Sequence, residues 1–434
     1  MNFLKKIFSP TILTISFLLL IYTFYKSEII WDGNKGNYYK TYYLISSILI
    51  CFSIITFFIN DIIKQYLIIS GISLIVSLYL FEGYLTLNQL SKEQLSKEQL
   101  YEKQTGKKWD RRSRLDIYKE IKKNNKKFTI SYTPNYILDE NDTNVLFPLS
   151  GVSNSETIFC NENGYLSIYQ SDRYGFNNPD NEWDEKEIEY LLVGDSFTHG
   201  ACVNRPDDIS SVLRNLSKKS VLNLGMRGNG PLIEYATLRE YLNTKVKKVL
   251  WIYFEGNDAG NLENEKKNDI LINYLKDLNF TQNLKFKQND IDDLLSDLIE
   301  ERVKEREREI FKFELIKFIK IYNTRFLILP ALAPAPEFKQ ILQLTKELAN
   351  KNNSKLYFVY LPGYSRYKKT YDNTNYKLVE EIVNELKIPF IDIHKEVFEK
   401  EQNPLKLFPF ELFGHYNVDG FKKVAETIYK FSKD

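Results

Sequence analysis

The chain has 434 residues, which is too many for one compact domain and suits two or three. Its 59 basic and 57 acidic residues leave a net charge of +2, which argues against a nucleic-acid partner because nucleic-acid-binding proteins usually carry a strong basic excess. Three cysteines are too few for a disulfide-dense scaffold. Without a CxxC motif or a Cys/His cluster, we expect neither a metal site nor a cofactor.

The first quarter of the chain contains three apolar runs, at residues 10–25, 42–60 and 62–84. A bilayer core needs about 20 apolar residues per helix. The second and third runs meet this length, and the first meets it if Ile29, Ile30 and Trp31 form its interfacial end. The runs therefore predict a three-helix transmembrane segment over residues 1–88 and a multi-pass membrane protein. A buried soluble hairpin is the alternative, but three such runs would overfill a small core. A cleaved signal peptide competes for the first run alone, although no small-residue cleavage site follows Tyr25.

The positive charges that flank these runs give conflicting orientations. Lys5 and Lys6 favour a cytoplasmic N-terminus, from which three spans place the rest of the chain outside. The first loop carries Lys26, Lys35 and Lys40, and more lysines follow the third run, so a plain count favours the opposite orientation. The charges therefore leave the sidedness of the large C-terminal part open.

Residues 89–187 form a predicted linker and accessory segment. The tandem repeat SKEQLSKEQL at 91–100 favours a helix that leads out of the membrane or acts as a spacer. Beyond it, turn-rich stretches at 148–154, 160–164 (CNENG) and 171–180 indicate short strands joined by turns.

From residue 188 onwards, short apolar strands alternate with helices. Strands are predicted at 189–193, 220–224, 246–253, 355–361 and 388–393, and helices at 209–216, 232–242, 378–386 and 420–431. This alternation is typical of a parallel sheet that is covered on both faces. The sequence therefore predicts an α/β fold, a three-layer α/β/α domain with a five-stranded parallel sheet over residues 188–434.

A helical insertion at residues 262–330 interrupts this rhythm and is too long for an ordinary connection within an α/β unit. It passes through the charged run EERVKEREREI at 300–310 and ends in an apolar stretch at 311–329 that contains four basic residues. Two interpretations of that stretch stay open: an amphipathic helix in a membrane interface, or a helix packed on the domain core.

The sequence GDSFTHG at 194–200 follows the first predicted strand. Open α/β sheets bind ligands at the carboxyl ends of their strands, which is where Ser196 falls. The backbone N–H groups of the following turn point towards bound anions there. Taken alone, a Gly-Asp-Ser sequence is more often only a turn.

Two more turns follow the second and third strands. In NLGMRGNGP at 223–231, Gly228 lets the backbone approach a substrate oxygen closely because glycine has no Cβ. In YFEGND at 253–258, Asn257 offers a side-chain amide. Together with the N–H groups of Ser196 and Gly228, this amide would complete a three-donor site for an oxyanion.

A serine nucleophile needs a base, and the chain has three histidines. His199 is too near Ser196 on the same helical turn for its ring to reach the hydroxyl group, and His394 begins a polar helix. His415 stands in a predicted loop before the last helix, from which it can fold back over the sheet edge. We therefore expect His415 to be the base.

In this order, the four segments resemble the signature blocks of the SGNH hydrolases, also called the GDSL esterase superfamily. The resemblance covers about residues 188–261 and 330–434 and implies a flavodoxin-like SGNH fold. It implies that Ser196 is the nucleophile, that Gly228 and Asn257 are oxyanion donors, and that His415 is the base.

One position departs from the family pattern. The family usually has Asp three residues before the histidine, and Leu412 stands there in this chain. Glu411 is the first candidate for the carboxylate that orients the imidazole, and Asp392 at the end of the fifth strand is the second. A Ser–His dyad without a carboxylate is the third alternative.

The resemblance implies acyl transfer through an acyl-serine, so that water as acceptor makes the protein an esterase and a sugar hydroxyl makes it an O-acyltransferase. Membrane-tethered members of the superfamily often modify surface polysaccharides. We therefore expect an acylated envelope glycan or a lipid as substrate, membrane lipid around the anchor and, for a transferase, an acyl-donor membrane protein as partner. Two rival hypotheses are a catalytically degenerate module that binds glycan or anchors an envelope complex, and a lipid esterase that faces the cytosol.

The cysteines bear on the sidedness. Disulfides persist in oxidising compartments, and tethered relatives in this superfamily carry outward-facing domains. We predict a Cys160–Cys202 bridge that pins the accessory segment beside the active site, with the catalytic domain outside the cytoplasm. Two unrelated buried thiols are the alternative. Cys51, inside the second apolar run, is expected to be a buried free thiol.

Overall fold

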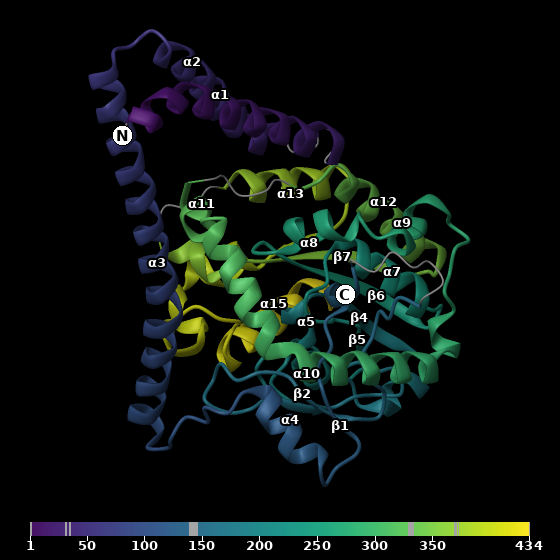
Figure 1. Ribbon diagram of the computed structural model, residues 1–434. Coiled ribbons are helices and arrows are strands. Elements are labelled where there is room, and N and C mark those ends of the chain that lie inside the picture. The colour runs from purple at the N-terminus through teal and green to yellow at the C-terminus, as the bar shows by residue number, and fades with distance from the viewer. Residues whose placement is uncertain are drawn as a thin grey trace. The chain divides into compact units, whose positions relative to one another are not determined.

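A computed structural model of the protein describes residues 2–30, 33, 36–138, 146–328, 334–368, 371 and 373–433. The chain forms two compact units (Figure 1). The membrane unit comprises Met1–Lys92 with Glu307–Leu332, and the α/β unit comprises Glu93–Arg306 with Ala333–Asp434. The predicted insertion at 262–330 is therefore divided between the two units, and its apolar end belongs with the N-terminal helices.

The membrane unit is built on α1 (Asn2–Phe24), α2 (Gly36–Thr56) and α3 (Asp61–Thr105). Three stretches are long and apolar enough to cross a membrane, namely Phe3–Ile29, Tyr38–Thr56 and Asp61–Leu87, which agrees with the three predicted spans. Cys51 is a free thiol but is exposed, contrary to the expectation of burial. The reason is that only 17% of the second span is buried within the protein.

The accessory segment contains a small three-stranded sheet. β1 (Phe128–Ile130) pairs in parallel with β2 (Glu156–Ile158), and β2 pairs in antiparallel fashion with β3 (Ile168–Gln170). Helix α4 (Arg114–Lys122) precedes this sheet, and its first turn is fixed by a capping box between Ser113 and Asp116. The described residues of the accessory segment from Glu93 onwards belong to the α/β unit.

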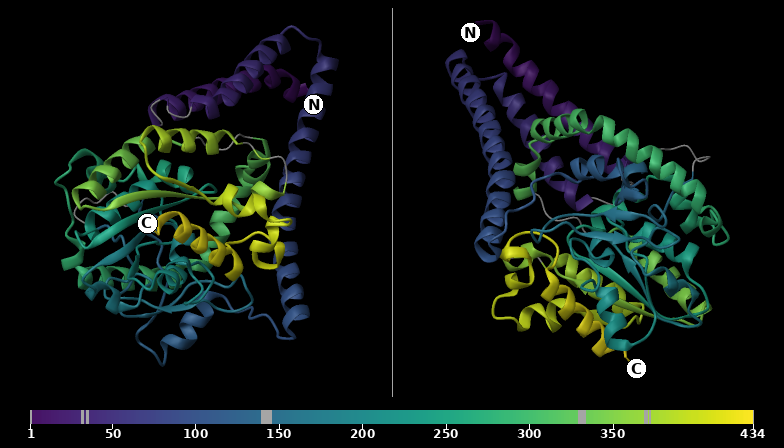
Figure 2. Two further views of the ribbon diagram at one scale, coloured as in Figure 1. Left: turned by 180° about the vertical axis from the view of Figure 1, so that it is seen from behind. Right: turned by 90° about the horizontal axis from the view of Figure 1, so that it is seen from below.

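A five-stranded parallel sheet, in the order β5-β4-β6-β7-β8, organises the α/β unit (Figure 2). Its strands are β4 (Ile188–Gly194), β5 (Val221–Asn223), β6 (Val246–Phe254), β7 (Lys355–Leu361) and β8 (Phe390–Asp392). Every pairing in this sheet is parallel. The chain passes from β4 to β5 on one side of β4 and then to β6 on its other side, so the strand order has a switch point at β4. Ligands bind at the carboxyl ends of the strands at such a switch point in open α/β sheets.

Helices cover both faces of this sheet. On one face, α7 (Pro231–Tyr241), α12 (Glu337–Lys351) and α13 (Thr374–Glu385) enclose a large apolar core. On the other face, α6 (Ile209–Ser217) and α15 (Val418–Ser432) enclose a second core. The predicted three-layer α/β/α fold is confirmed, and its strands are mainly apolar because both faces of the sheet are buried.

The remaining helices lie in the connections. They are α5 (Ser196–His199), α8 (Asp258–Glu265), α9 (Asp269–Lys276), α10 (Gln288–Ile319), α11 (Tyr322–Ile328) and α14 (Ile393–Glu396). The turns after β4, β5 and β6 all open at the carboxyl edge of the sheet, and they carry the segments that the sequence singled out.

Candidate active site

Ser196 lies at the start of α5, directly after β4, and its side chain is 7% exposed. Asp195 caps this short helix by accepting a hydrogen bond from the backbone N–H of Phe197 at 2.9 Å. Gly194 ends the strand where a Cβ would fall 2.6 Å from the carbonyl oxygen of Ile252, so the turn accepts no larger residue without a shift. The local sequence therefore forces Ser196 to the carboxyl edge of the sheet.

The imidazole of His415 faces this serine. Its Nε2 lies 2.9 Å from Ser196 Oγ, although 219 residues separate the two in the sequence. His415 precedes α15, whose first turn is capped by Asn417. The ring of Phe197 packs against that of His415, with centroids 4.7 Å apart, and holds the imidazole from one side.

Glu162, from the CNENG turn of the accessory segment, occupies the position of a triad acid. Its Oε1 lies 3.0 Å from His415 Nδ1, and its Oε2 accepts the backbone N–H of His415 at 2.7 Å. This two-point contact fixes both the ring and the backbone of the histidine. A carboxylate at Nδ1 holds the tautomer in which Nε2 can accept the serine proton, and it stabilises the imidazolium that then forms.

The surroundings of Glu162 strongly favour its ionised carboxylate form. Burial would raise its pKa, but the charge and hydrogen bonds of His415, together with the charge of Lys97, lower the pKa to about 2. Lys97 also donates from Nζ to the backbone carbonyl of Phe413 at 2.6 Å, two residues before the histidine. Glu162 is therefore ionised throughout the physiological range, and Lys97 braces the loop that carries His415.

The disulfide between Cys160 and Cys202 anchors the turn that carries Glu162, with Cα atoms 5.0 Å apart. The Cys202 sulfur, a Glu162 carboxylate oxygen and a ring nitrogen of His415 all lie within 4.8 Å of one another. Since this sulfur is held in the disulfide, the group lacks the thiolate that a metal site would need. Asn163 adds a hydrogen bond from its side-chain amide to the Cys202 carbonyl oxygen at 2.9 Å.

Two candidates for the acid lie elsewhere. Glu411 accepts a hydrogen bond from the Asn403 side chain at 3.1 Å and does not take the place of the acid, which is a correction to the expectation. Glu411 has φ of 59° and follows Phe410 with φ of 55°, so two consecutive residues of this loop adopt the left-handed region. Asp392 caps α14 and accepts a hydrogen bond from Tyr376.

The oxyanion candidates are tied to the serine turn. Asn257 stands at the N-cap position of α8, where its side chain makes no capping hydrogen bond. Its side-chain Nδ2 donates instead to Asp195 Oδ2 at 3.1 Å, the same oxygen to which Ser196 Oγ donates at 3.3 Å. Gly228 has φ of +77°, which glycine adopts without strain, and a Cβ there would lie 2.6 Å from Thr133 Cγ2. Asn261, one turn along α8, holds the Gly228 carbonyl at 3.3 Å.

The other two histidines have separate surroundings. His199 is fully buried between Phe159 and Tyr169, and burial, aided by the charge of Arg227, lowers its pKa to about 3. His394 lies 2.7 Å from the hydroxyl of Tyr367 through its Nδ1. Neither ring takes part in the contact with Ser196.

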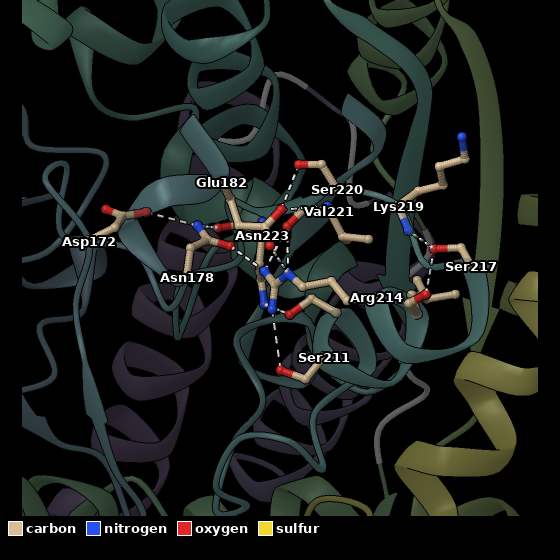
Figure 3. A network of polar contacts seen from close by, with 12 residues as sticks. Asp172, Asn178, Glu182, Ser211, Arg214, Ser217, Lys219, Ser220, Val221 and Asn223 are labelled. Carbon is tan, nitrogen blue, oxygen red and sulfur yellow. Dashed lines mark hydrogen bonds and ion pairs between the residues drawn. The ribbon is translucent and has the colours of Figure 1, made fainter. Parts of the chain in front are cut away.

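A buried polar network fixes the edge of the sheet next to the serine turn (Figure 3). The Asn178 side chain accepts a hydrogen bond from the backbone N–H of Asn223 at 2.8 Å and donates one to the backbone carbonyl of Asn223 at 2.9 Å. It thus makes the two hydrogen bonds that the backbone of a neighbouring strand would make. Arg214 donates to the same Asn178 oxygen at 2.9 Å. The Asn223 side chain in turn donates to the Thr198 carbonyl in α5 at 2.7 Å, so the network reaches the helix that Ser196 begins.

No protein-family model matches the chain, and no curated protein matches it. Among solved structures, one similar chain is described as a lipolytic protein of the G-D-S-L family from Desulfitobacterium hafniense DCB-2, with 14% identity and a TM-score of 0.32. Another is phospholipase A1 from Streptomyces albidoflavus NA297, with 10% identity and a TM-score of 0.33. Each alignment covers 56% of this chain and 99% of the other. These TM-scores are too low for the likeness to carry an argument about activity.

Proposed function

We propose that this chain is a membrane-anchored member of the SGNH hydrolase superfamily that acts as a serine esterase or O-acyltransferase through an acyl-serine. The observation that carries the proposal is the continuous contact from Ser196 Oγ through the two ring nitrogens of His415 to the Glu162 carboxylate, at 2.9 and 3.0 Å. The four sequence blocks support it independently, since each falls at the carboxyl edge of the sheet or before the last helix.

The first half-reaction forms an ester on the protein. Ser196 Oγ attacks the substrate carbonyl carbon while His415 Nε2 takes the hydroxyl proton, and Glu162 stabilises the imidazolium. The N–H groups of Ser196 and Gly228 and the Asn257 amide stabilise the oxyanion of the tetrahedral intermediate. The carbon–oxygen bond to the leaving alcohol then breaks, and His415 returns the proton to that alcohol.

The second half-reaction regenerates the serine. Water, or a sugar hydroxyl, loses its proton to His415 and attacks the acyl-serine carbonyl, and the Ser196 ester bond breaks as the serine oxygen takes the proton back. Water makes the protein an esterase, and a sugar hydroxyl makes it an O-acyltransferase. We infer an acylated envelope polysaccharide or a lipid as substrate, and an acyl-donor membrane protein as partner if the acceptor is a sugar.

The disulfide supports a catalytic domain outside the cytoplasm, because disulfides persist in oxidising compartments. The disulfide agrees with the orientation that Lys5 and Lys6 favour. It opposes the orientation that the plain lysine count favours, and it therefore also opposes the hypothesis of a lipid esterase that faces the cytosol. The hypothesis of a catalytically degenerate binding module was based on the absence of the family's Asp three residues before His415. Glu162 supplies a carboxylate from another segment, which weakens that alternative.

The proposal is tested with the full-length protein in detergent and a panel of p-nitrophenyl esters of increasing acyl length. The wild type should hydrolyse at least one ester, Ser196→Ala should lose that activity, and Glu411→Gln should retain it. Adding an oligosaccharide acceptor and finding acylated sugar would identify a transferase. Equal rates for the wild type and Ser196→Ala would contradict the proposal.

A further inference from the structure

The apolar end of the insertion, in Glu307–Leu332, packs within the membrane unit against α3. The described contacts with the N-terminal helices run from Phe318 to Arg325, and α10 ends at Ile319 and α11 begins at Tyr322 within this range. The ring of Phe318 lies 5.5 Å from that of Tyr79 and reaches the backbone of α3 at Gly83, where a Cβ would be 3.7 Å away. Gly83 therefore allows the two helices to come close.

The break between α10 and α11 leaves backbone groups without helical partners, and α3 provides partners for them. The hydroxyl of Tyr79 donates to the carbonyl of Ile319 at 3.0 Å, at the last residue of α10. The carboxylate of Glu82 accepts the N–H groups of Asn323 and Thr324 at 2.9 and 2.8 Å, in the first turn of α11. A helix break in water needs no such partners, because water hydrogen-bonds the free groups.

Glu82 is buried completely, although it stands in the third apolar span. The hydroxyl of Thr324 also donates to it, at 2.7 Å, so three donors from α11 surround the carboxylate. Ionisable side chains within membrane helices are costly and are kept when a defined partner satisfies them. The partner here is the start of α11.

The contacts with the third span indicate how deep in the bilayer the break between α10 and α11 lies. Glu82 and Tyr79 lie five and eight residues before Leu87, the end of the span. At about 1.5 Å per residue these distances are roughly 8 and 12 Å. Amphipathic helices lie with their apolar faces about 5–10 Å into the boundary between headgroups and acyl chains. The break between α10 and α11 thus falls close to that boundary.

The outer face of this segment suits lipid. Leu315, Ile316 and Ile319 share one face of α10, at spacings of three and four residues, and their side chains are 44%, 39% and 57% exposed. Lys317 and Lys320 supply long cationic side chains that can extend to headgroups. Arg325 of α11 donates to the hydroxyl of Tyr38 in α2 at 3.0 Å, which adds a second membrane helix to the attachment.

We propose that residues 315–325 form an interfacial element that is inserted into the bilayer at the headgroup–acyl boundary and is held there by Glu82 and Tyr79 of the third span. Its partner is the lipid bilayer. The backbone break is tolerated at that depth because protein groups satisfy it, which is the condition for irregular backbone within a membrane. This inference does not depend on the proposed catalytic activity.

The test places an environment-sensitive NBD label on the full-length protein in vesicles of phosphatidylcholine and phosphatidylglycerol. Cys51→Ser removes the free thiol, and single cysteines are introduced at Ile316 and Ile319. Ile72→Cys, 55% exposed in the third span, is the membrane control, and Leu278→Cys, 63% exposed in the α/β unit, is the aqueous control. Quenching by lipids with a nitroxide near the headgroup is compared with quenching by aqueous iodide.

The labels at positions 316 and 319 should emit at shorter wavelength than the label at 278, and shallow nitroxide lipids should quench them more than iodide does. Labels that behave like the one at 278 would overturn the insertion. Labels that neither quencher reaches would also overturn it, since a protein partner would then cover the segment.

The attachment is tested with Glu82→Leu, which removes the acceptor, and Glu82→Gln, which keeps one acceptor oxygen. Glu82→Leu should move the emission at 319 towards the aqueous value, and Glu82→Gln should move it less. An unchanged emission in Glu82→Leu would overturn the role of Glu82. If Glu82→Leu does not fold, the depth of the labels in the Cys51→Ser background still decides whether the segment is inserted.

Discussion

Replacing Glu162 by Gln removes the carboxylate charge beside His415 while keeping the size of the side chain. The pKa of Glu162 lies at about 2, against an ordinary value of 4.5. At roughly 1.4 kcal/mol for each pH unit, this is about 3 kcal/mol of net favourable interaction, to which His415 contributes most and Lys97 adds. Loss of this interaction from the imidazolium of the transition state corresponds to a decrease in rate of roughly 10²-fold.

A second effect increases the loss. A Gln amide that donates to Nδ1 would hold the imidazole in the tautomer that cannot accept the serine proton, and this effect alone costs roughly 10⁴-fold in a serine protease triad. We therefore expect kcat for p-nitrophenyl ester hydrolysis to fall by roughly 10² to 10⁴-fold in Glu162→Gln. Glu162→Asp should fall less, because the charge remains.

Glu411→Gln is the matched control for this experiment. It changes a glutamate of the loop before His415 that contacts Asn403 instead of the imidazole, and its kcat should equal that of the wild type. Circular dichroism melts of each variant separate a loss of catalysis from a loss of folding. A Glu162→Gln protein with wild-type kcat, or a Glu411→Gln protein with the larger loss, would refute the assignment.

Three further predictions follow from the same site. Asn257→Ala should cost about 2.7–4 kcal/mol of transition-state stabilisation if its amide holds the oxyanion, and an unchanged kcat/KM would contradict that role. Reduction of the Cys160–Cys202 bridge should lower kcat towards that of Glu162→Gln, because Glu162 stands two residues from Cys160. Full activity after reduction would show that the bridge is not needed to position Glu162. The folded-state pKa of Glu162 lies below its unfolded value, so its contribution to stability is present above about pH 4.5 and is lost as pH falls towards about 2. Denaturant melts should therefore show a steeper acid loss in the wild type than in Glu162→Gln, and parallel losses would contradict the ion pair.

The fold could be predicted from the sequence because parallel strands that are buried on both faces are apolar along most of their length. The strand found at Ile188–Gly194 was predicted at 189–193, and the one at Lys355–Leu361 was predicted at those same residues. Short strands at the edges were less certain: β8 covers Phe390–Asp392, where 388–393 was predicted. A short edge strand has fewer apolar residues, so its ends are weakly marked.

The sequence did not indicate Glu162 as the partner of His415, because the family pattern places the acid three residues before the histidine. Glu162 comes from a turn of the accessory segment, 253 residues before the histidine, where no spacing rule points to it. A signal existed, since the predicted Cys160–Cys202 bridge places residue 162 beside a turn only six residues after Ser196. Glu162 is the carboxylate nearest to Cys160 in the sequence.

The apolar end of the insertion also needed the structure. Its composition fitted both a core helix and an interfacial one, because four lysines or arginines among apolar residues suit either. The deciding contacts, from Glu82 and Tyr79 to the break between α10 and α11, join segments about 240 residues apart. Hydrophobic periodicity cannot reveal a pairing at that separation.

We propose that Ser196 is a nucleophile activated by His415, and covalent labelling of the serine measures this activation directly. The full-length protein is treated with a fluorophosphonate probe, digested and analysed by mass spectrometry. The probe should attach to the peptide containing Ser196, no label should form in Ser196→Ala, and labelling should be much slower in His415→Ala. An unlabelled Ser196 in the folded protein, or labelling at the same rate in His415→Ala, would contradict it.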